Sequence, residues 1–154
     1  LSSSATPAVF PLSADFPLVQ FSPTSALGGE NDDSMAFVTV IPDMITLADE
    51  RALLGDLDPV FGRKRYERGH WDAVIEDYKE SERLDGSWSP RCRQLVANIR
   101  AFLAQSSWLP VHAIDLSSNG FVRPHVDSVK FSGGVVAGLS LVSSAVMQLT
   151  RAAD

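Results

Sequence analysis

The stretch GFVRPHVDSVKF, residues 120–131, carries the pattern on which the fold and the chemistry of this chain depend. His125 and Asp127 stand two positions apart within it. On a β-strand, residues two apart point to the same face, so an imidazole and a carboxylate would emerge side by side from a rigid element. Such a pair supplies two of the three ligands of a 2-His-1-carboxylate site for Fe(II). The tripeptide by itself is weak evidence for a metal, because any His-x-Asp on a strand would match, and it fits a solvated polar pair at a strand end better.

Strands are expected on both sides of this motif. Residues 111–116 and 121–127 are predicted to be strands, separated by a turn at SSNG, residues 117–120. Residues 131–150 carry no charge, but their glycines and serines make the run too polar and too rich in turn formers for a transmembrane helix. We therefore predict two buried strands, Val135–Val142 and Ala145–Thr150, joined by a turn at Ser143-Ser144.

Two helices are predicted upstream of the strands. The first follows a short strand at 37–41, begins at a capping pattern of Thr46 and Asp49, and ends at Pro59. The second spans 90–104.

Local signals define the second helix best. Ser89 is a natural N-cap, and Pro90 suits the first helical position. Cys92 lies on the apolar stripe of this helix, so it is interpreted as a small core residue rather than a reactive thiol. The segment between the helices, residues 62–85, is rich in charge and aromatic side chains, and its pattern does not separate helix from strand. Helices followed by consecutive strands indicate an α+β fold.

Composition restricts the classes of function. With 154 residues, 45% hydrophobic and 21% charged, the chain has room for one ordinary globular domain. The net charge of −6 argues against a surface that wraps nucleic acid, so strong nucleic-acid binding is not expected. The one basic run, RKRY at 63–66, is interpreted as a solvated surface segment rather than a nucleic-acid contact. A single cysteine excludes an intrachain disulfide.

Residues 1–35 are expected to form a flexible Ser/Pro-rich leader, with the domain occupying residues 36–154. The first 34 residues contain no Lys or Arg, so neither a secretory signal nor a mitochondrial presequence is visible there. Because the chain starts at Leu1 and stops at Asp154 just after an apolar run, we expect it to be a fragment.

The motif and its flanks resemble the AlkB family of Fe(II)/2-oxoglutarate dioxygenases. The resemblance covers residues 36–151 and includes the run at 120–131, Gly133 and the segment AGLSL at 137–141. The upstream segments RYE at 65–67 and HWDA at 70–73 are similar to the mitochondrial branch of the family in particular.

This resemblance implies a double-stranded β-helix, or jelly roll, buttressed by N-terminal helices, of which the chain would hold the N-terminal part. His125 and Asp127 would be metal ligands for Fe(II), with 2-oxoglutarate and O₂ as co-substrates. The family's third ligand is a later histidine, and none follows His125 in this sequence, so that ligand is expected outside this chain. The fragment is therefore expected to be inactive alone. A structural role is favoured for His70 and His112.

One departure from the family concerns the co-substrate pocket. DNA-repairing relatives carry Asn and Tyr on the strand before the motif, where this chain has Ile114 and Leu116. These two residues are the candidate apolar edge of the cofactor-binding pocket.

The resemblance further implies oxidative hydroxylation or demethylation in the mitochondrial matrix, linked to fatty-acid metabolism and programmed necrosis. The substrate, whether protein, RNA or metabolite, stays open. The alternative is a non-catalytic interaction or regulatory module on the same fold, which the apolar pocket edge and the absent second histidine also fit.

Overall fold

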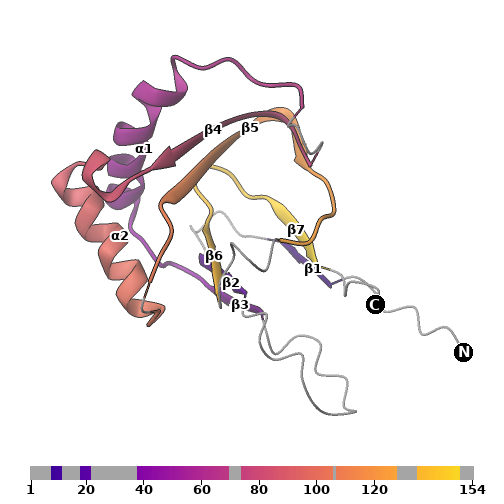
Figure 1. The fold of residues 1–154 in the computed structure, drawn as a ribbon. Coiled ribbons are helices and arrows are strands. Elements are labelled where there is room, and N and C mark those ends of the chain that lie inside the picture. The colour runs from indigo at the N-terminus through magenta and orange to yellow at the C-terminus, as the bar shows by residue number, and fades with distance from the viewer. Residues whose placement is uncertain are drawn as a thin grey trace, which may run out of the picture. The chain divides into compact units, whose positions relative to one another are not determined.

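The computed structural model describes residues 8–11, 18–21, 38–69, 74–105, 107–127 and 135–149. The chain forms two compact units, one of residues 47–125 and one of residues 1–46 with 126–154. Figure 1 labels the helices and strands. In chain order they are β1 (Ala8–Pro11), β2 (Leu18–Phe21), β3 (Val38–Ile41), α1 (Leu47–Phe61), β4 (Ile75–Arg83), α2 (Pro90–Phe102), β5 (Val111–Val122), β6 (Val136–Leu139) and β7 (Val146–Leu149). The expected α+β class is confirmed, while the closed jelly roll stays a prediction.

Helix α1 buries one apolar side and begins directly after the predicted cap residue Thr46. Leu53 and Leu57 are only 4% and 6% exposed, as their helical spacing predicts. The predicted stop at Pro59 is wrong by two residues, because α1 continues to Phe61. Pro59 lies in the last turn, where its missing N–H removes a single hydrogen bond. The helix closes instead at Gly62, whose N–H donates to the Asp58 carbonyl at 2.7 Å.

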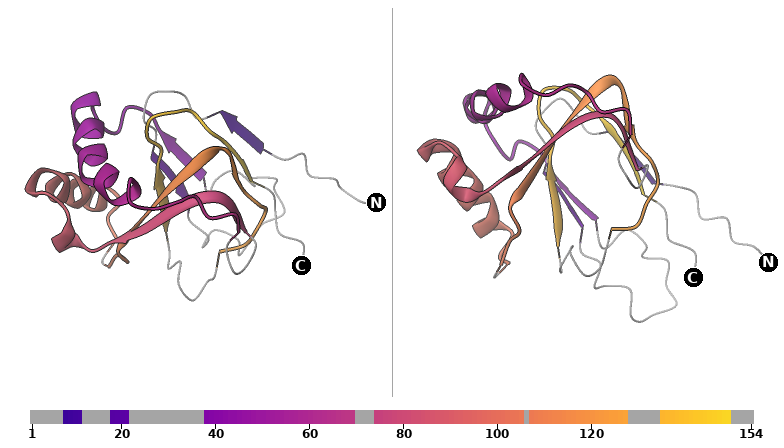
Figure 2. Two further views of the ribbon diagram at one scale, coloured as in Figure 1. Left: turned by 90° about the horizontal axis from the view of Figure 1, so that it is seen from above. Right: turned by 45° about the horizontal axis from the view of Figure 1, so that its top comes forward.

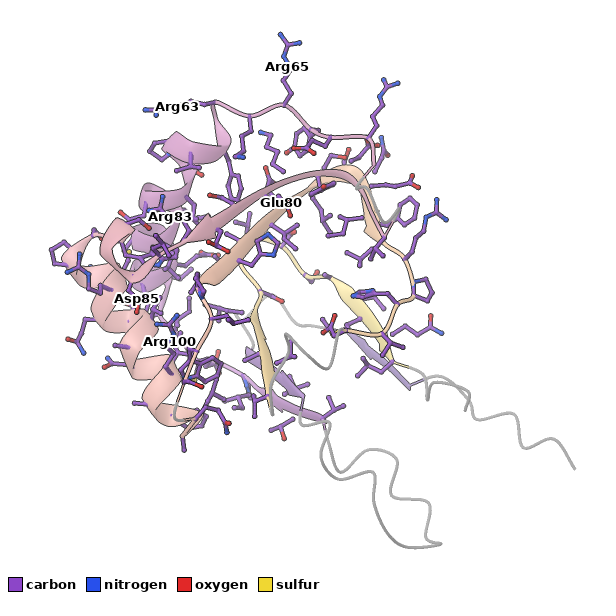
Figure 3. The ribbon with its side chains drawn as sticks, in the orientation of Figure 1. Arg63, Arg65, Glu80, Arg83, Asp85 and Arg100 are labelled. Atoms are coloured by element: carbon purple, nitrogen blue, oxygen red, sulfur yellow. The ribbon has the colours of Figure 1, made fainter. Side chains whose placement is uncertain are left out.

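Helix α2 confirms its predicted start. The Ser89 hydroxyl accepts the Cys92 N–H at 3.4 Å, and Pro90 occupies the first turn. Cys92 is fully buried, and burial raises the pKa of its thiol, as expected of a core cysteine. At the other end, Arg100 Nη1 donates to both carboxylate oxygens of Asp85 at 2.8 Å, across the connection that precedes the helix (Figure 3).

The partly buried carboxylate of Asp56 links the two helices by a hydrogen bond. Asp56 of α1 accepts the backbone N–H of Ser89 at 2.7 Å, at the cap of α2. Partial burial acts to raise the pKa of Asp56, but hydrogen bonds from Ser89 and Cys92 and the charge of Arg83 lower it overall. Because its folded-state pKa is lowered, the negative charge of Asp56 stabilises the folded helix pair. A second link between the helices is the ion pair between Arg91 and Asp49, at 3.0 Å.

Replacing Asp56 with asparagine is expected to lower the free energy of unfolding by about 1 kcal/mol at pH 7, the difference between a charged and a neutral hydrogen bond. A lowered folded-state pKa stabilises the protein above the ordinary aspartate pKa of about 3.9, and this contribution is lost as pH falls through the folded-state value. The difference between variant and parent should thus vanish in acid. Urea unfolding at several pH values measures it, with the exposed Asp58→Asn as control; a difference that persists at pH 2 contradicts the assignment.

Strands β4 and β5 form the ladder of the unit 47–125. They are antiparallel, and their pairing runs from Arg83 opposite Val111 to Ile75 opposite Val122. Figure 2 shows this pair as a long curved ribbon, with α1 and α2 side by side near the end where β4 finishes. The core of the unit joins Leu53 and Leu57 to buried side chains from the other elements, namely Tyr78, Trp88, Cys92 and Leu103. The ladder is therefore anchored at its helical end.

The remaining strands form two small antiparallel sheets, ordered β3-β2-β6 and β1-β7. Strands β6 and β7 lie within the predicted strands 135–142 and 145–150, but they belong to different sheets and do not pair as a hairpin. The expectation that these strands are buried is wrong for Val146, which is 68% exposed.

The partners of β6 and β7 come from the segment expected to be a flexible leader. Leu18 lies opposite Leu139, and Ala8 opposite Leu149. Such pairing leaves no local pattern, because four-residue strands between prolines show no period and these partners in β6 and β7 lie more than a hundred residues away. The domain boundary at residue 35 stays a prediction.

None of the helices in the described ranges has the length and apolar character needed to cross a membrane.

Candidate functional site

The motif HVD lies immediately after β5 rather than on a strand. β5 ends at Val122, and residues 123–127 follow it without regular structure. The prediction of a strand over 121–127 is therefore wrong beyond Val122. Pro124 explains the end of the strand, because it has no N–H to continue the ladder; the last bond is donated by Arg123 N–H to the Val74 carbonyl at 2.7 Å. His125 and Asp127 are both exposed.

The predicted turn at 117–120 is also wrong, because β5 passes through these residues without reversing. Phe121 lies opposite Glu76 and Leu116 opposite Tyr78, so four residues of β5 face the single residue Asp77. The turn-forming residues are accommodated as a large bulge, and Asp77 adopts a positive φ of 49°. This bulge stands between the regular part of the ladder and the motif.

Gly120 is the residue that permits the bulge. A Cβ at this position would lie 2.5 Å from the Asp77 carbonyl oxygen and 2.9 Å from the Ser117 nitrogen. Both are backbone atoms, which cannot rotate away as a side chain would. Only glycine therefore allows the two strands to approach this closely.

The ring of His125 is oriented by the backbone. Its Nδ1 lies 2.9 Å from the carbonyl oxygen of Arg123. A carbonyl oxygen only accepts, so Nδ1 carries the proton in this hydrogen bond and the lone pair of the neutral ring is on Nε2. A metal-binding histidine commonly has its other nitrogen fixed in this way.

Asp127 belongs to the unit made of residues 1–46 and 126–154, whereas His125 is the last residue of the unit 47–125. By donor type, the imidazole of His125 and the carboxylate of Asp127 both fit Fe(II). Within the part of the chain that the structure describes, no three His, Cys, Asp or Glu side chains gather so as to hold a metal.

The two candidate pocket residues share one face of β5. Ile114 and Leu116 alternate with half-buried neighbours and are 43% and 40% exposed. Their role in binding 2-oxoglutarate stays a prediction. The residue of this region that the sequence did not single out is Arg123. Its carbonyl oxygen orients the ring of His125, and its side chain contacts Glu76 and Phe121.

His112 makes its contact elsewhere on the ladder of β4 and β5. His112 lies on β5 and its Nε2 is 3.0 Å from Glu80 Oε2 on β4, a cross-strand contact that agrees with a structural role. His70 lies outside the described residues.

The basic run between α1 and β4 faces solvent. Figure 3 shows Arg63 and Arg65 projecting outward from this connection. Tyr66 contacts the ladder instead. Its hydroxyl donates a hydrogen bond to Asp115 at 3.0 Å, which raises the pKa of Tyr66. Lys79 Nζ lies 4.3 Å from the centroid of the Tyr66 ring. The aromatic side chain is therefore engaged with the ladder, and the exposed cations form a short surface segment.

Comparison with known proteins gives two similar relatives, while no family model matches the chain. The chain is 38% identical over 136 residues to the alpha-ketoglutarate-dependent dioxygenase alkB homolog 7, mitochondrial, of Mus musculus, covering 86% of this chain and 59% of the relative. It is 39% identical over 115 residues to the protein of the same name from Bos taurus, covering 73% of this chain and 51% of the relative. The chain thus spans between half and three-fifths of the length of these relatives.

Proposed function

This chain is a homologue of the mitochondrial alkB homolog 7 dioxygenases, and on that premise we propose that it carries part of an Fe(II)/2-oxoglutarate-dependent dioxygenase. Alpha-ketoglutarate, named in both relatives, is 2-oxoglutarate. The homology over 86% of the chain is the observation that carries the proposal. We further propose that the protein acts in mitochondria, as the names of both relatives say of them.

His125 and Asp127 are the residues proposed to hold the metal. The hydrogen bond from His125 Nδ1 to Arg123 supports this role, because it makes Nε2 the nitrogen with a lone pair for a metal. Fe(II), when bound, supplies the chemistry by which O₂ and 2-oxoglutarate give succinate and CO₂ while a C–H bond of the substrate becomes C–OH. On an N-methyl group the hydroxylated product releases formaldehyde, which amounts to demethylation.

The protein's own contribution is to hold and orient these groups. Ile114 and Leu116 are proposed to form an apolar edge of the co-substrate pocket, excluding water there. The links to fatty-acid metabolism and programmed necrosis stay predictions from the family resemblance.

Succinate formation tests the proposal. The intact gene product, incubated with 2-oxoglutarate, Fe(II) and oxygen, is expected to release succinate, and omission of Fe(II) should stop the release. Mn(II) binding, followed by electron paramagnetic resonance, checks the metal site without turnover. A protein that neither binds Mn(II) nor forms succinate would contradict the enzyme and support a non-catalytic interaction module.

Single-stranded RNA is expected to bind weakly at physiological salt, with a dissociation constant above about 1 μM. The basic run supplies only Arg63, Lys64 and Arg65 in sequence, so few phosphates are neutralised, and each contributes a slope of roughly −0.7 to log K against log salt. Titration of labelled RNA at two salt concentrations measures this slope. Replacing the three cations with glutamine should remove most of the binding, and a tight complex that survives raised salt would contradict the prediction.

A further inference from the structure

Arg123, directly after β5, is held at two further points besides its backbone N–H bond to Val74. Its guanidinium forms an ion pair with the Glu76 carboxylate of β4. It also lies over the ring of Phe121, 5.1 Å from the centroid. A residue outside regular structure is thus fixed by both main chain and side chain.

The ladder explains why these groups meet. Glu76 and Phe121 are directly opposite one another, so their side chains share one face of the strand pair. Arg123 comes two residues after Phe121 and returns to that face. An exposed ion pair alone contributes little, but here it acts together with the cation–π contact and the backbone hydrogen bond on a single residue. We call Glu76, Phe121 and Arg123 the strand-end cluster.

The strand-end cluster leads directly to His125. The carbonyl of Arg123 accepts the hydrogen bond from His125 Nδ1 at 2.9 Å. Between the two residues stands Pro124, which fixes its own φ and restricts the conformation of Arg123. The spacer is short and stiff, so a carbonyl held in place by Arg123 holds the imidazole as well.

We propose that Arg123 is a positioning residue for the proposed metal ligand: through the strand-end cluster it fixes the carbonyl that keeps His125 in the Nδ1–H tautomer, in which the lone pair of the ring is on Nε2. This inference rests on the proposed function for its purpose, but its structural content concerns only residues 74–125. Loss of the cluster should loosen the carbonyl and let the ring redistribute between tautomers and orientations.

The test uses the intact gene product labelled with ¹⁵N-histidine, without metal, at a pH well above the usual imidazole value of about 6.5. Nitrogen chemical shifts report which ring nitrogen carries the proton. The parent protein is expected to show His125 mainly as the Nδ1–H tautomer. Arg123→Gln and the isosteric Glu76→Gln should each lower that fraction at least about twofold, and weaken Mn(II) binding about tenfold, the lower end for loss of an outer-shell partner.

Two further variants separate positioning from general stability. Arg91→Gln breaks another exposed ion pair, to Asp49 at 3.0 Å, and should change neither tautomer nor metal affinity. Arg123→Lys keeps the charge and should restore much of the parent tautomer fraction. A parent protein with mainly Nε2–H at His125, or a tautomer fraction that Arg123→Gln and Glu76→Gln leave unchanged, overturns the proposal. A shifted tautomer without Mn(II) binding in any form supports the positioning role while contradicting the proposed metal site.

Discussion

Replacing Asp127 with alanine is expected to abolish Mn(II) binding and Fe(II)-dependent succinate formation in the intact gene product. The variant removes one of the two proposed protein ligands of this chain, so the loss of metal affinity should exceed the roughly 10–100-fold that follows loss of an outer-shell partner. Asp127 is exposed and lies outside any helix or strand, so the substitution should leave the fold unchanged. Succinate release and electron paramagnetic resonance of Mn(II) measure the two effects.

Asp58→Ala is the matched control for this experiment. Asp58 is also an exposed aspartate, on α1, and its replacement changes the net charge by the same amount. Metal affinity and turnover should stay at the parent level in the control, which excludes a general electrostatic effect. Full succinate formation by the Asp127→Ala variant would show that this carboxylate is not a ligand, and the assignment of the HVD motif would then be wrong.

Gly120→Ala is expected to destabilise the unit 47–125 by about 1–3 kcal/mol, the usual cost of inserting a methyl group into filled space. The added Cβ would lie 2.5 Å from the Asp77 carbonyl oxygen and 3.1 Å from that of Glu76. Relief requires the two strands to separate at the bulge, and Glu76 belongs to the strand-end cluster. The same variant should therefore also weaken Mn(II) binding.

The same substitution at Gly55 provides the control for Gly120→Ala. Gly55 lies inside α1, and a Cβ there meets nothing within 4 Å. Because alanine is the better helix former, Gly55→Ala should stabilise the protein by roughly 0.5–1 kcal/mol. Urea unfolding compares the two variants. Equal stability of Gly120→Ala and the parent would show that the bulge has room for a side chain and would contradict the close approach of the strands.

The extent to which sequence predicts this fold depends on how local the signals are. The start of α2 was predictable because Ser89 and Pro90 act on the backbone groups next to them. The bulge at 117–120 was not, because its residues are typical turn formers, and only the register with Asp77 decides that the strand continues. In the same way, Pro59 is a helix breaker in general, but its cost is small in a last turn.

The candidate site shows the same division. His125 and Asp127 are proposed as ligands from their residue types and spacing, since metal ligands are limited to a few side chains. The pairing of Arg123 with Glu76 joins residues 47 positions apart, and no local pattern encodes it. Pro124 is the one local signal, because it ends the strand and stiffens the step from Arg123 to His125.

The pairing of β1 and β2 with β7 and β6 has a consequence for synthesis on the ribosome. Ala8 pairs with Leu149, so β1 is made long before its partner β7, and at about 5–20 residues per second it waits on the order of ten seconds; β2 waits similarly for β6, although its other partner, β3, follows soon after it. During this time the short segments offer unpaired backbone to other nascent chains. Prolines border them at positions 7, 11, 17 and 23, and proline cannot donate to an intermolecular ladder. These prolines are therefore expected to act as gatekeepers that protect the nascent chain until β6 and β7 emerge.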